Sequence, residues 1–250
     1  MKAGVIENML VLGIDTTTLS CSVAVANSDK VLAEYSLQSK KTHSEKLLPL
    51  IDAVVRTAGC KPGDLEGVAV SIGPGSFTGL RIGIATARAL GQTLNIPLAG
   101  ISTLEVLAAQ IPFFHGLISP ILDARRQQVY NAIFCAGEKP TRLVDERAIG
   151  LNDLLAELAG MDERVLFIGD GVSVHRRIIQ TVLGEAACFL PPEGNYIRAA
   201  TVARLGLSVL NLKQGKSYLE LMPSYIRHSE AEVKYLQRLG KEGDRPGYNH

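Results

Sequence analysis

Two halves of this sequence carry the same order of expected elements, and this repeat constrains the fold more than any other feature. The apolar run 9–15 ends in Asp15, and a second apolar run, 118–124, carries Asp123 near its end. In each half two more β-rich segments follow this strand, and then come a helix, a strand and another helix. The halves share element order and not residue identity. The pattern predicts an α/β protein with two similar lobes.

Hydrophobic periodicity places the individual elements. The segments 9–15, 21–27 and 30–38 have short connections and predict an antiparallel meander. The helix that follows has an apolar face at helical spacing, formed by Leu47, Leu50, Ile51, Val54, Val55 and Ala58. We expect Ser44 to cap its start and Gly59 its end. Further strands are expected at 65–73, 96–101, 118–124, 127–137, 141–150 and 164–171, and further helices at 76–95, 103–110, 151–160, 173–184 and 199–212.

Composition excludes several classes of function. With a net charge of +1, no Trp and 5% aromatic residues, the chain lacks the basic surface and the stacking platform of a nucleic-acid-binding protein. Its four cysteines stand alone, which excludes zinc and dithiol motifs, and Cys21 and Cys135 lie in apolar runs that favour buried thiols. The N-terminus lacks the apolar region of a signal peptide, and no stretch reaches the ~20 apolar residues of a membrane span. We expect a cytoplasmic protein without a membrane partner.

Residues arranged for catalysis or metal binding are scarce. The five histidines are His43, His115, His175, His228 and His250. They form neither an HExxH motif nor any pair at i, i+4 spacing. No GxSxG elbow is present, and His43 before Ser44 and Glu45 fits a helix cap better than a catalytic triad. The segment 168–172, IGDGV, could line a cleft between the lobes, but a role as a strand-end turn is favoured. We therefore expect no catalytic residue, no metal and no intrinsic cofactor.

Asp15 and Asp123 would lie at equivalent turns that face a cleft between the lobes. Actin-like and sugar-kinase-like proteins hold ATP in this way, with backbone N–H groups of two glycine-bearing hairpins around the phosphates and carboxylates on Mg²⁺. Here the turns read DTTT and DARR and contain no glycine. A structural role for both aspartates is favoured over metal–nucleotide binding. The residues that could still contact a nucleotide or an anion are Asp15, Thr16, Thr17, Ser76, Arg81 and Asp123.

The segment GPGSFTGLR, 73–81, leads into the helix expected at 76–95. It is neither a P-loop, which needs a Lys, nor GxGxxG, although the helix N-terminus could bind an anion. Small residues recur at every fourth position of this segment: Gly75, Gly79, Gly83, Ala87 and Gly91. A glycine inside a helix costs about 1 kcal/mol relative to alanine. We therefore expect another backbone to lie close to this stripe, either of the preceding helix or of a second protein chain.

Six motifs identify a resemblance to a known family. LGIDTT, HSEKLLP, SIGPGSFTGLRIG, DARRQQVY, GDG and the late MPSYIR resemble the TsaB (YeaZ) family, and the likeness runs from about Met9 to Arg227. It implies a bacterial protein of the actin/Hsp70/sugar-kinase-like (ASKHA) fold. The expected lobes are 9–110 and 111–227, each a mixed sheet with flanking helices. Residues 1–8 and 239–250 are expected to be flexible ends.

The resemblance also implies a function and partners. It indicates a non-catalytic subunit that pairs with a catalytic TsaD-type subunit, which carries the histidine pair that binds metal. The complex transfers a threonylcarbamoyl group to N6 of the adenosine that follows the anticodon of tRNA. A TsaE-type ATPase would support turnover, and ATP or ADP would serve the complex and could lie at the shared interface. The free chain could form a self-dimer, and tRNA would be reached through the complex.

The family further implies that the helices after His43 and Ser76 form the partner surface. The interface residues expected on this basis are His43, Ser44, Leu47, Leu48, Gly75, Ser76, Phe77, Thr78, Gly79, Leu80, Gly83 and Ala87. A bulky residue at Gly79 or Gly83 is expected to prevent association and to leave the fold largely intact. Two other functions stay open: an ATP-dependent phosphotransferase of the same fold, and a metallopeptidase, since relatives were once classed as glycoproteases.

Overall fold

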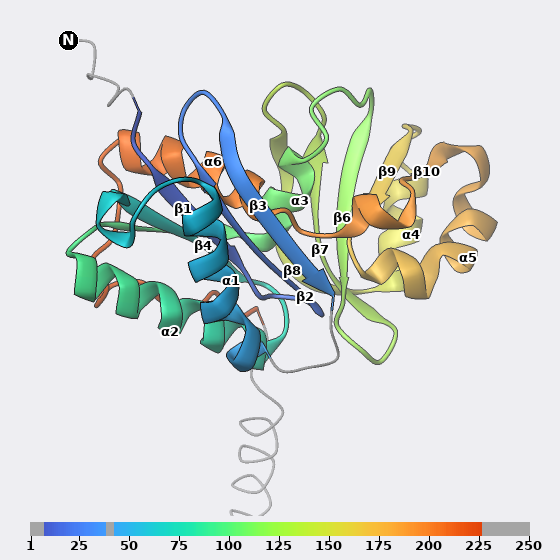
Figure 1. Ribbon diagram of the computed structural model, residues 1–250. Helices are drawn as coiled ribbons and strands as arrows, with labels where there is room; N and C mark the ends of the chain where they lie inside the picture. The colour runs from blue at the N-terminus through green and yellow to red at the C-terminus, as the bar shows by residue number, and fades with distance from the viewer. Residues whose placement is uncertain (1–7, 39–42, 227–250) are drawn as a thin grey trace, which may run out of the picture.

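The computed structural model describes residues 8–38 and 43–226, which form two five-stranded sheets with helices packed on them (Figure 1). The first half contains β1 (Val11–Asp15), β2 (Ser20–Ala26), β3 (Val31–Gln38), α1 (His43–Thr57), β4 (Gly67–Gly73), α2 (Phe77–Leu94), β5 (Leu98–Ser102) and α3 (Thr103–Ala109). The second half contains β6 (Leu117–Asp123), β7 (Gln128–Cys135), β8 (Thr141–Gly150), α4 (Leu151–Ala159), β9 (Val165–Ile168), α5 (Gly171–Leu183), β10 (Ala187–Phe189) and α6 (Ala199–Asn211). Short 3₁₀ turns lie at Pro62–Asp64, Gly184–Ala186 and Pro192–Asn195.

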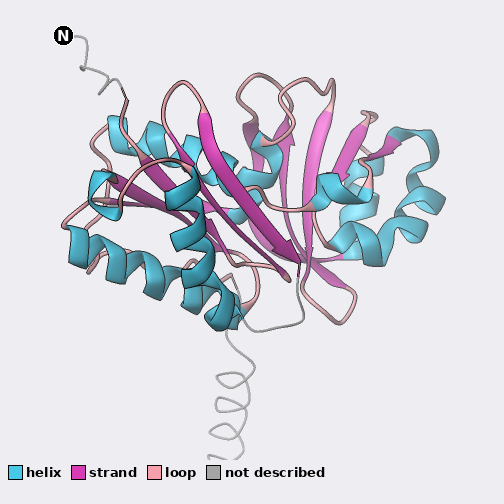
Figure 2. Cartoon of the chain, in the orientation of Figure 1, coloured by secondary structure: helices cyan, strands magenta, loops and turns pink. Residues whose placement is uncertain are grey.

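The two sheets have equivalent topology. Their strand orders are β3-β2-β1-β4-β5 and β8-β7-β6-β9-β10. In both, the first three strands pair antiparallel, and the last two continue the sheet in parallel (Figure 2). The expected repeat and the ASKHA fold are thus confirmed. The sequence missed only β10, a strand of three residues that occupies in the second sheet the position of β5 in the first.

The continuous apolar runs of β1 and β2 follow from burial on both faces of the first sheet. Leu12 and Ile14 pack with α1 and α2 on one face, whereas Val11 packs with α6 on the other. Gly13 lies on the α6 face, where a Cβ would overlap the Ala199 carbonyl oxygen. A sheet covered on both faces needs apolar residues at every position rather than at alternate ones.

The central core joins the two halves of the chain. Helix α6 packs on β1, β2, β4 and β5 of the first sheet, while α3 contacts strands of both sheets. One cluster of buried side chains therefore includes Leu104 and Leu107 of α3, Ile118 and Phe134 of the second sheet, and Val202 of α6. The expected boundary near residue 110 falls between α3 and β6. Helix α6 was expected in the second lobe, but it covers the face of the first sheet that α1 and α2 leave open.

Local signals at element ends were only partly correct. Ser76 is the N-cap of α2 and accepts a hydrogen bond from Gly79 N at 3.3 Å. Gly59 follows α1 with φ +73°, as expected for a left-handed helix end. The α1 helix, however, already includes His43, so Ser44 lies inside it. Cys21 is buried as expected, but Cys135, the last residue of β7, is exposed. The predicted flexible ends, apart from Asn8, lie outside the described residues.

Candidate functional site

Three glycines of the α2 stripe, Gly75, Gly79 and Gly83, face the turn between β1 and β2 of the same chain, whereas Gly91 faces the side chain of Leu98. A Cβ at Gly79 would overlap the carbonyl oxygen of Thr16, and a Cβ at Gly75 would lie 2.5 Å from that of Thr17. At Gly83 a Cβ would overlap the Thr16 hydroxyl. The prediction that another backbone lies close to the stripe is correct. The backbone is neither that of the preceding helix nor that of a second chain, the two expected alternatives, because the turn of the same chain occupies the space at Gly75, Gly79 and Gly83.

Hydrogen bonds tie this turn to the starts of both helices. Thr16 Oγ1 donates to the Gly79 carbonyl at 2.7 Å, and Ser76 N donates to the Thr17 carbonyl at 2.7 Å. His43 Nε2 lies 2.8 Å from the Thr18 carbonyl oxygen, so the first residue of α1 reaches the same turn. The turn and the two helix starts therefore form one connected unit.

Asp15 is buried at the centre of this unit. Its side chain is 0% exposed, and Thr17 Oγ1 donates to its Oδ1 at 2.8 Å. Burial raises the pKa of Asp15 to about 6, while the hydroxyls of Ser71 and Thr17 oppose the rise and the charge of Asp170 adds to it. Asp15 Oδ2 and Ser71 Oγ are both buried, and neither forms a hydrogen bond with a described residue. Asp15 is thus a carboxylate held in an unfavourable site.

The second sheet places two more carboxylates at the corresponding strand ends. Asp170, in the turn between β9 and α5, accepts a hydrogen bond from Asp123 N at 3.0 Å through Oδ1. Asp123 is exposed and accepts from Arg125 N at 2.9 Å. Burial raises the pKa of Asp170, and the charge of Asp123 also raises it. The sequence interpretation noted the Gly-Asp-Gly turn after this strand but did not place Asp170 among the candidate site residues.

This arrangement does not fit a phosphate wrapped by both turns. The backbone of the first turn packs against α2, and Thr16 and Thr17 are buried. In the second turn the backbone is left-handed at three successive non-glycine residues, Arg125, Arg126 and Gln127, with φ of 61°, 53° and 59°. Within 8–38 and 43–226, no group of three or more His, Cys, Asp or Glu residues is placed to hold a metal ion. The backbone of the first turn is therefore covered by α2 in this structure.

The expected interface residues divide by exposure. Ser44, Leu48, Ser76 and Thr78 are exposed, and His43, Gly75 and Phe77 are partly exposed. Leu47, Gly79, Leu80, Gly83 and Ala87 are buried in the chain itself, because they hold α1 and α2 on the sheet. The exposed set lies at the starts of the two helices, which run along the same side of the first sheet (Figure 1). Only this set is available to a partner.

The structure adds Tyr225 to this surface. Its ring stacks on that of Phe77 with 4.9 Å between centroids, and the Arg81 guanidinium lies 3.9 Å from the Phe77 centroid. Arg81 Nε donates to the Tyr225 hydroxyl at 3.3 Å. The sequence had singled out Phe77 and Arg81, and it included Tyr225 only within the motif MPSYIR, because Tyr225 is 144 residues from Arg81.

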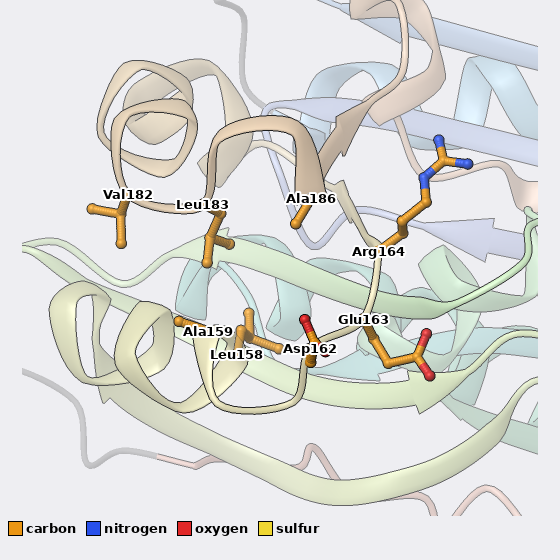
Figure 3. Close-up of a pocket in the computed structure, with 8 residues that line it drawn as sticks. All are labelled: Leu158, Ala159, Asp162, Glu163, Arg164, Val182, Leu183 and Ala186. Carbon is orange, nitrogen blue, oxygen red and sulfur yellow. The ribbon is translucent and has the colours of Figure 1, made fainter.

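A surface pocket of about 320 Å³ lies at the other end of the molecule, where α4 and α5 end (Figure 3). Leu183 points toward Leu158 and Asp162 across it. Its lining is mostly aliphatic and carries the exposed charged residues Asp162, Glu163 and Arg164 at one edge. These residues do not form a catalytic constellation.

Comparisons with known proteins assign the chain to a family. A family model described as TsaD: tRNA N6-adenosine threonylcarbamoyltransferase matches residues 30–235. The tRNA threonylcarbamoyladenosine biosynthesis protein TsaB of Bacillus subtilis is 36% identical over 92% of this chain and 99% of its own length. The chain belongs to the TsaB family. The TsaB of Haemophilus influenzae is 25% identical over 94% of this chain and 100% of its own length.

Solved structures of the TsaB (YeaZ) family have the same fold. YeaZ from Pseudomonas aeruginosa matches with a TM-score of 0.70 and 21% identity over 86% of this chain and 99% of its own. A second Pseudomonas aeruginosa structure, described as similar to peptidase YEAZ, matches with a TM-score of 0.74 and 21% identity over 87% and 99%. In the described part of the TsaB-family chain, no helix is both long enough and apolar enough to span a membrane.

Proposed function

We propose that this TsaB-family protein is a non-catalytic subunit in the biosynthesis of threonylcarbamoyladenosine in tRNA. The observation that carries the proposal is the 36% identity to a TsaB protein over nearly the full length of both chains. In this role it pairs with a TsaD-type subunit, which transfers the threonylcarbamoyl group to N6 of the adenosine after the anticodon. A TsaE-type ATPase acts on the pair in the cytoplasm, and tRNA is bound through the complex.

The exposed starts of α1 and α2 support this role. Leu48, in the first half of α1, is 60% exposed, and it lies on the same side of the first sheet as the half-exposed Phe77 and Tyr225. An apolar group of this kind on the surface is typical of a protein contact. The sequence lacks a histidine pair at i, i+4 spacing, which favours the partner role over that of the transferase. We propose that this surface contacts the TsaD-type subunit, or a second copy of the chain when that subunit is absent.

A phosphotransferase of the same fold is the second candidate, and the carboxylates at the ends of β1, β6 and β9 are the feature that favours it. Against it, Asp15 is fully buried and the backbone of its turn is packed on α2. A phosphate would have to displace the start of α2 to reach that backbone. We therefore assign ATP or ADP to the complex, at the shared interface, rather than to this chain alone.

An omission assay tests the proposed function. Purified tRNA is mixed with the TsaD-type subunit, the TsaE-type ATPase, the enzyme that makes the threonylcarbamoyl adenylate, threonine, bicarbonate and ATP, with or without this chain. We expect modified adenosine, measured by mass spectrometry, to accumulate over many turnovers only when the chain is present. Equal accumulation without it would contradict the proposal.

A charge at Leu48 tests the proposed surface. Leu48→Glu should weaken binding to the TsaD-type subunit at least about tenfold, because burying an unpaired carboxylate in an apolar contact is costly. Binding is measured by calorimetry. Leu143→Glu is the matched control, since Leu143 is 55% exposed but lies on β8 of the other sheet. Both variants should unfold at the wild-type temperature. If the two variants bind the TsaD-type subunit with equal affinity, α1 is excluded from the interface.

A further inference from the structure

We propose that Arg81 is an anion receptor on this surface and that it binds a carboxylate side chain of the partner subunit. The inference rests on the proposed function, because it names the chemistry by which the α1–α2 surface would recognise its partner. It follows from the way in which Phe77 and Tyr225 hold the guanidinium, and from the charges along α2.

The guanidinium is oriented before any partner binds. It lies 3.9 Å from the Phe77 ring centroid, and its Nε–H donates to the Tyr225 hydroxyl at 3.3 Å. An arginine has five N–H donors in a planar fork, which matches a carboxylate in bidentate geometry. Among the described residues no carboxylate forms an ion pair with Arg81. The remaining N–H groups of this exposed side chain are thus available to an external anion.

The segment after α6 fixes Tyr225 in its place. Lys216 and Leu98 exchange backbone hydrogen bonds of 2.9 and 2.7 Å, which attaches this segment to the edge strand β5. Leu221 is 1% exposed in the core of the first sheet, and Ser224 N donates to the Ile72 carbonyl at 2.8 Å. The residue next to Ser224 is therefore held by buried and hydrogen-bonded neighbours. Ordering the ring in advance lowers the entropy cost of binding through Arg81.

Charge complementarity favours an acidic partner. Between residues 77 and 94, α2 carries Arg81 and Arg88 and contains no acidic residue. Ala85 and Ala89, on its outer side, are small and exposed, so they leave room for a helix to approach. A polyanion such as RNA would need several clustered cations, whereas α2 offers two arginines and the chain has a net charge of +1. A protein carboxylate therefore fits better than a phosphate.

The test measures affinity for the purified TsaD-type subunit by calorimetry at low and at moderate salt. Arg81→Gln should raise Kd about tenfold to hundredfold and should reduce the salt dependence of binding. Arg81→Lys should recover only part of the affinity, because an ammonium group lacks the planar fork. Tyr225→Phe should weaken binding severalfold, since it keeps the ring but loses the hydroxyl that orients Arg81. Arg177→Gln on α5, which removes another exposed charge at the other end of the molecule, should bind within about twofold of wild type.

The outcomes separate the two proposals. Failure of the wild-type chain to bind the TsaD-type subunit overturns the proposed pairing itself. Wild-type binding with unchanged affinity in Arg81→Gln overturns the arginine proposal alone. If Arg81→Gln weakens binding of the chain to tRNA but not to the subunit, the ligand is a phosphate and the carboxylate proposal is wrong. Thermal melts of every variant should match wild type, because Arg81 and Tyr225 are exposed.

Discussion

Gly79→Ala is expected to lower the free energy of unfolding by about 3 kcal/mol or more, which should lower Tm by roughly 6–12 °C in a chain of this size. The added Cβ would overlap the Thr16 carbonyl oxygen. The neighbour is backbone and is held by the hydrogen bond from Thr16 Oγ1 to Gly79, so neither side can yield cheaply. Urea and thermal unfolding followed by circular dichroism measure the loss.

Gly63→Ala is the matched control, because nothing lies within 4 Å of a Cβ at that position. It should change stability by no more than about 0.5 kcal/mol. A Gly79→Ala protein that unfolds like wild type but no longer binds its partner would contradict the structure. It would restore the sequence hypothesis that the glycine stripe faces a second subunit.

Asp15→Asn is expected to stabilise the protein at neutral pH by up to about 3 kcal/mol, a value that corresponds to the rise in pKa from 3.8 to about 6. A carboxyl with a raised pKa binds more protons in the folded than in the unfolded state between these two values. The protonated Asp15 carboxyl therefore contributes its full stability to the fold below about pH 4. That contribution is lost as the pH rises toward 6 and the carboxyl loses its proton. The asparagine does not titrate, so the difference between the two proteins should vanish near pH 4 and be largest above pH 6.

Urea unfolding at intervals from pH 4 to pH 8 measures this difference. Asp52→Asn is a control, because Asp52 is exposed and forms only a surface ion pair with Arg56 at 3.1 Å. If Asp15→Asn is less stable than wild type at pH 7, the charged carboxylate has a stabilising contact that burial alone does not explain.

The order and type of most elements could be predicted because they depend on local patterns. Alternation, helical periodicity and caps are properties of neighbouring residues, and they located the strands, the main helices and the repeat to within a few residues. The apolar run 9–15, which ends in Asp15, predicted the strand β1. Three-residue β10 was missed because a strand so short has no periodicity to detect.

For the candidate site, the sequence identified α1, α2 and the segment GPGSFTGLR but not the direction in which α2 faces. Both sides of this helix carry small residues, and spacing alone cannot tell a glycine packed on its own chain from one that faces a partner. The structure places Gly79 and Gly83 against Thr16 and leaves Ala85 and Ala89 exposed. The interface positions inferred at Gly79 and Gly83 are therefore buried in the chain itself.

The sequence by itself determined the two repeated halves, the aspartates at their strand ends and the family to which the motifs point. Each of these features depends only on residues that are close together in the sequence. Only the tertiary structure decided that α6 covers the first sheet, that the charge of Asp170 acts on Asp15, and that Tyr225 meets Phe77 and Arg81. These contacts join residues far apart along the chain. Their physical reason is the packing of two sheets around one shared core, which local periodicity does not encode.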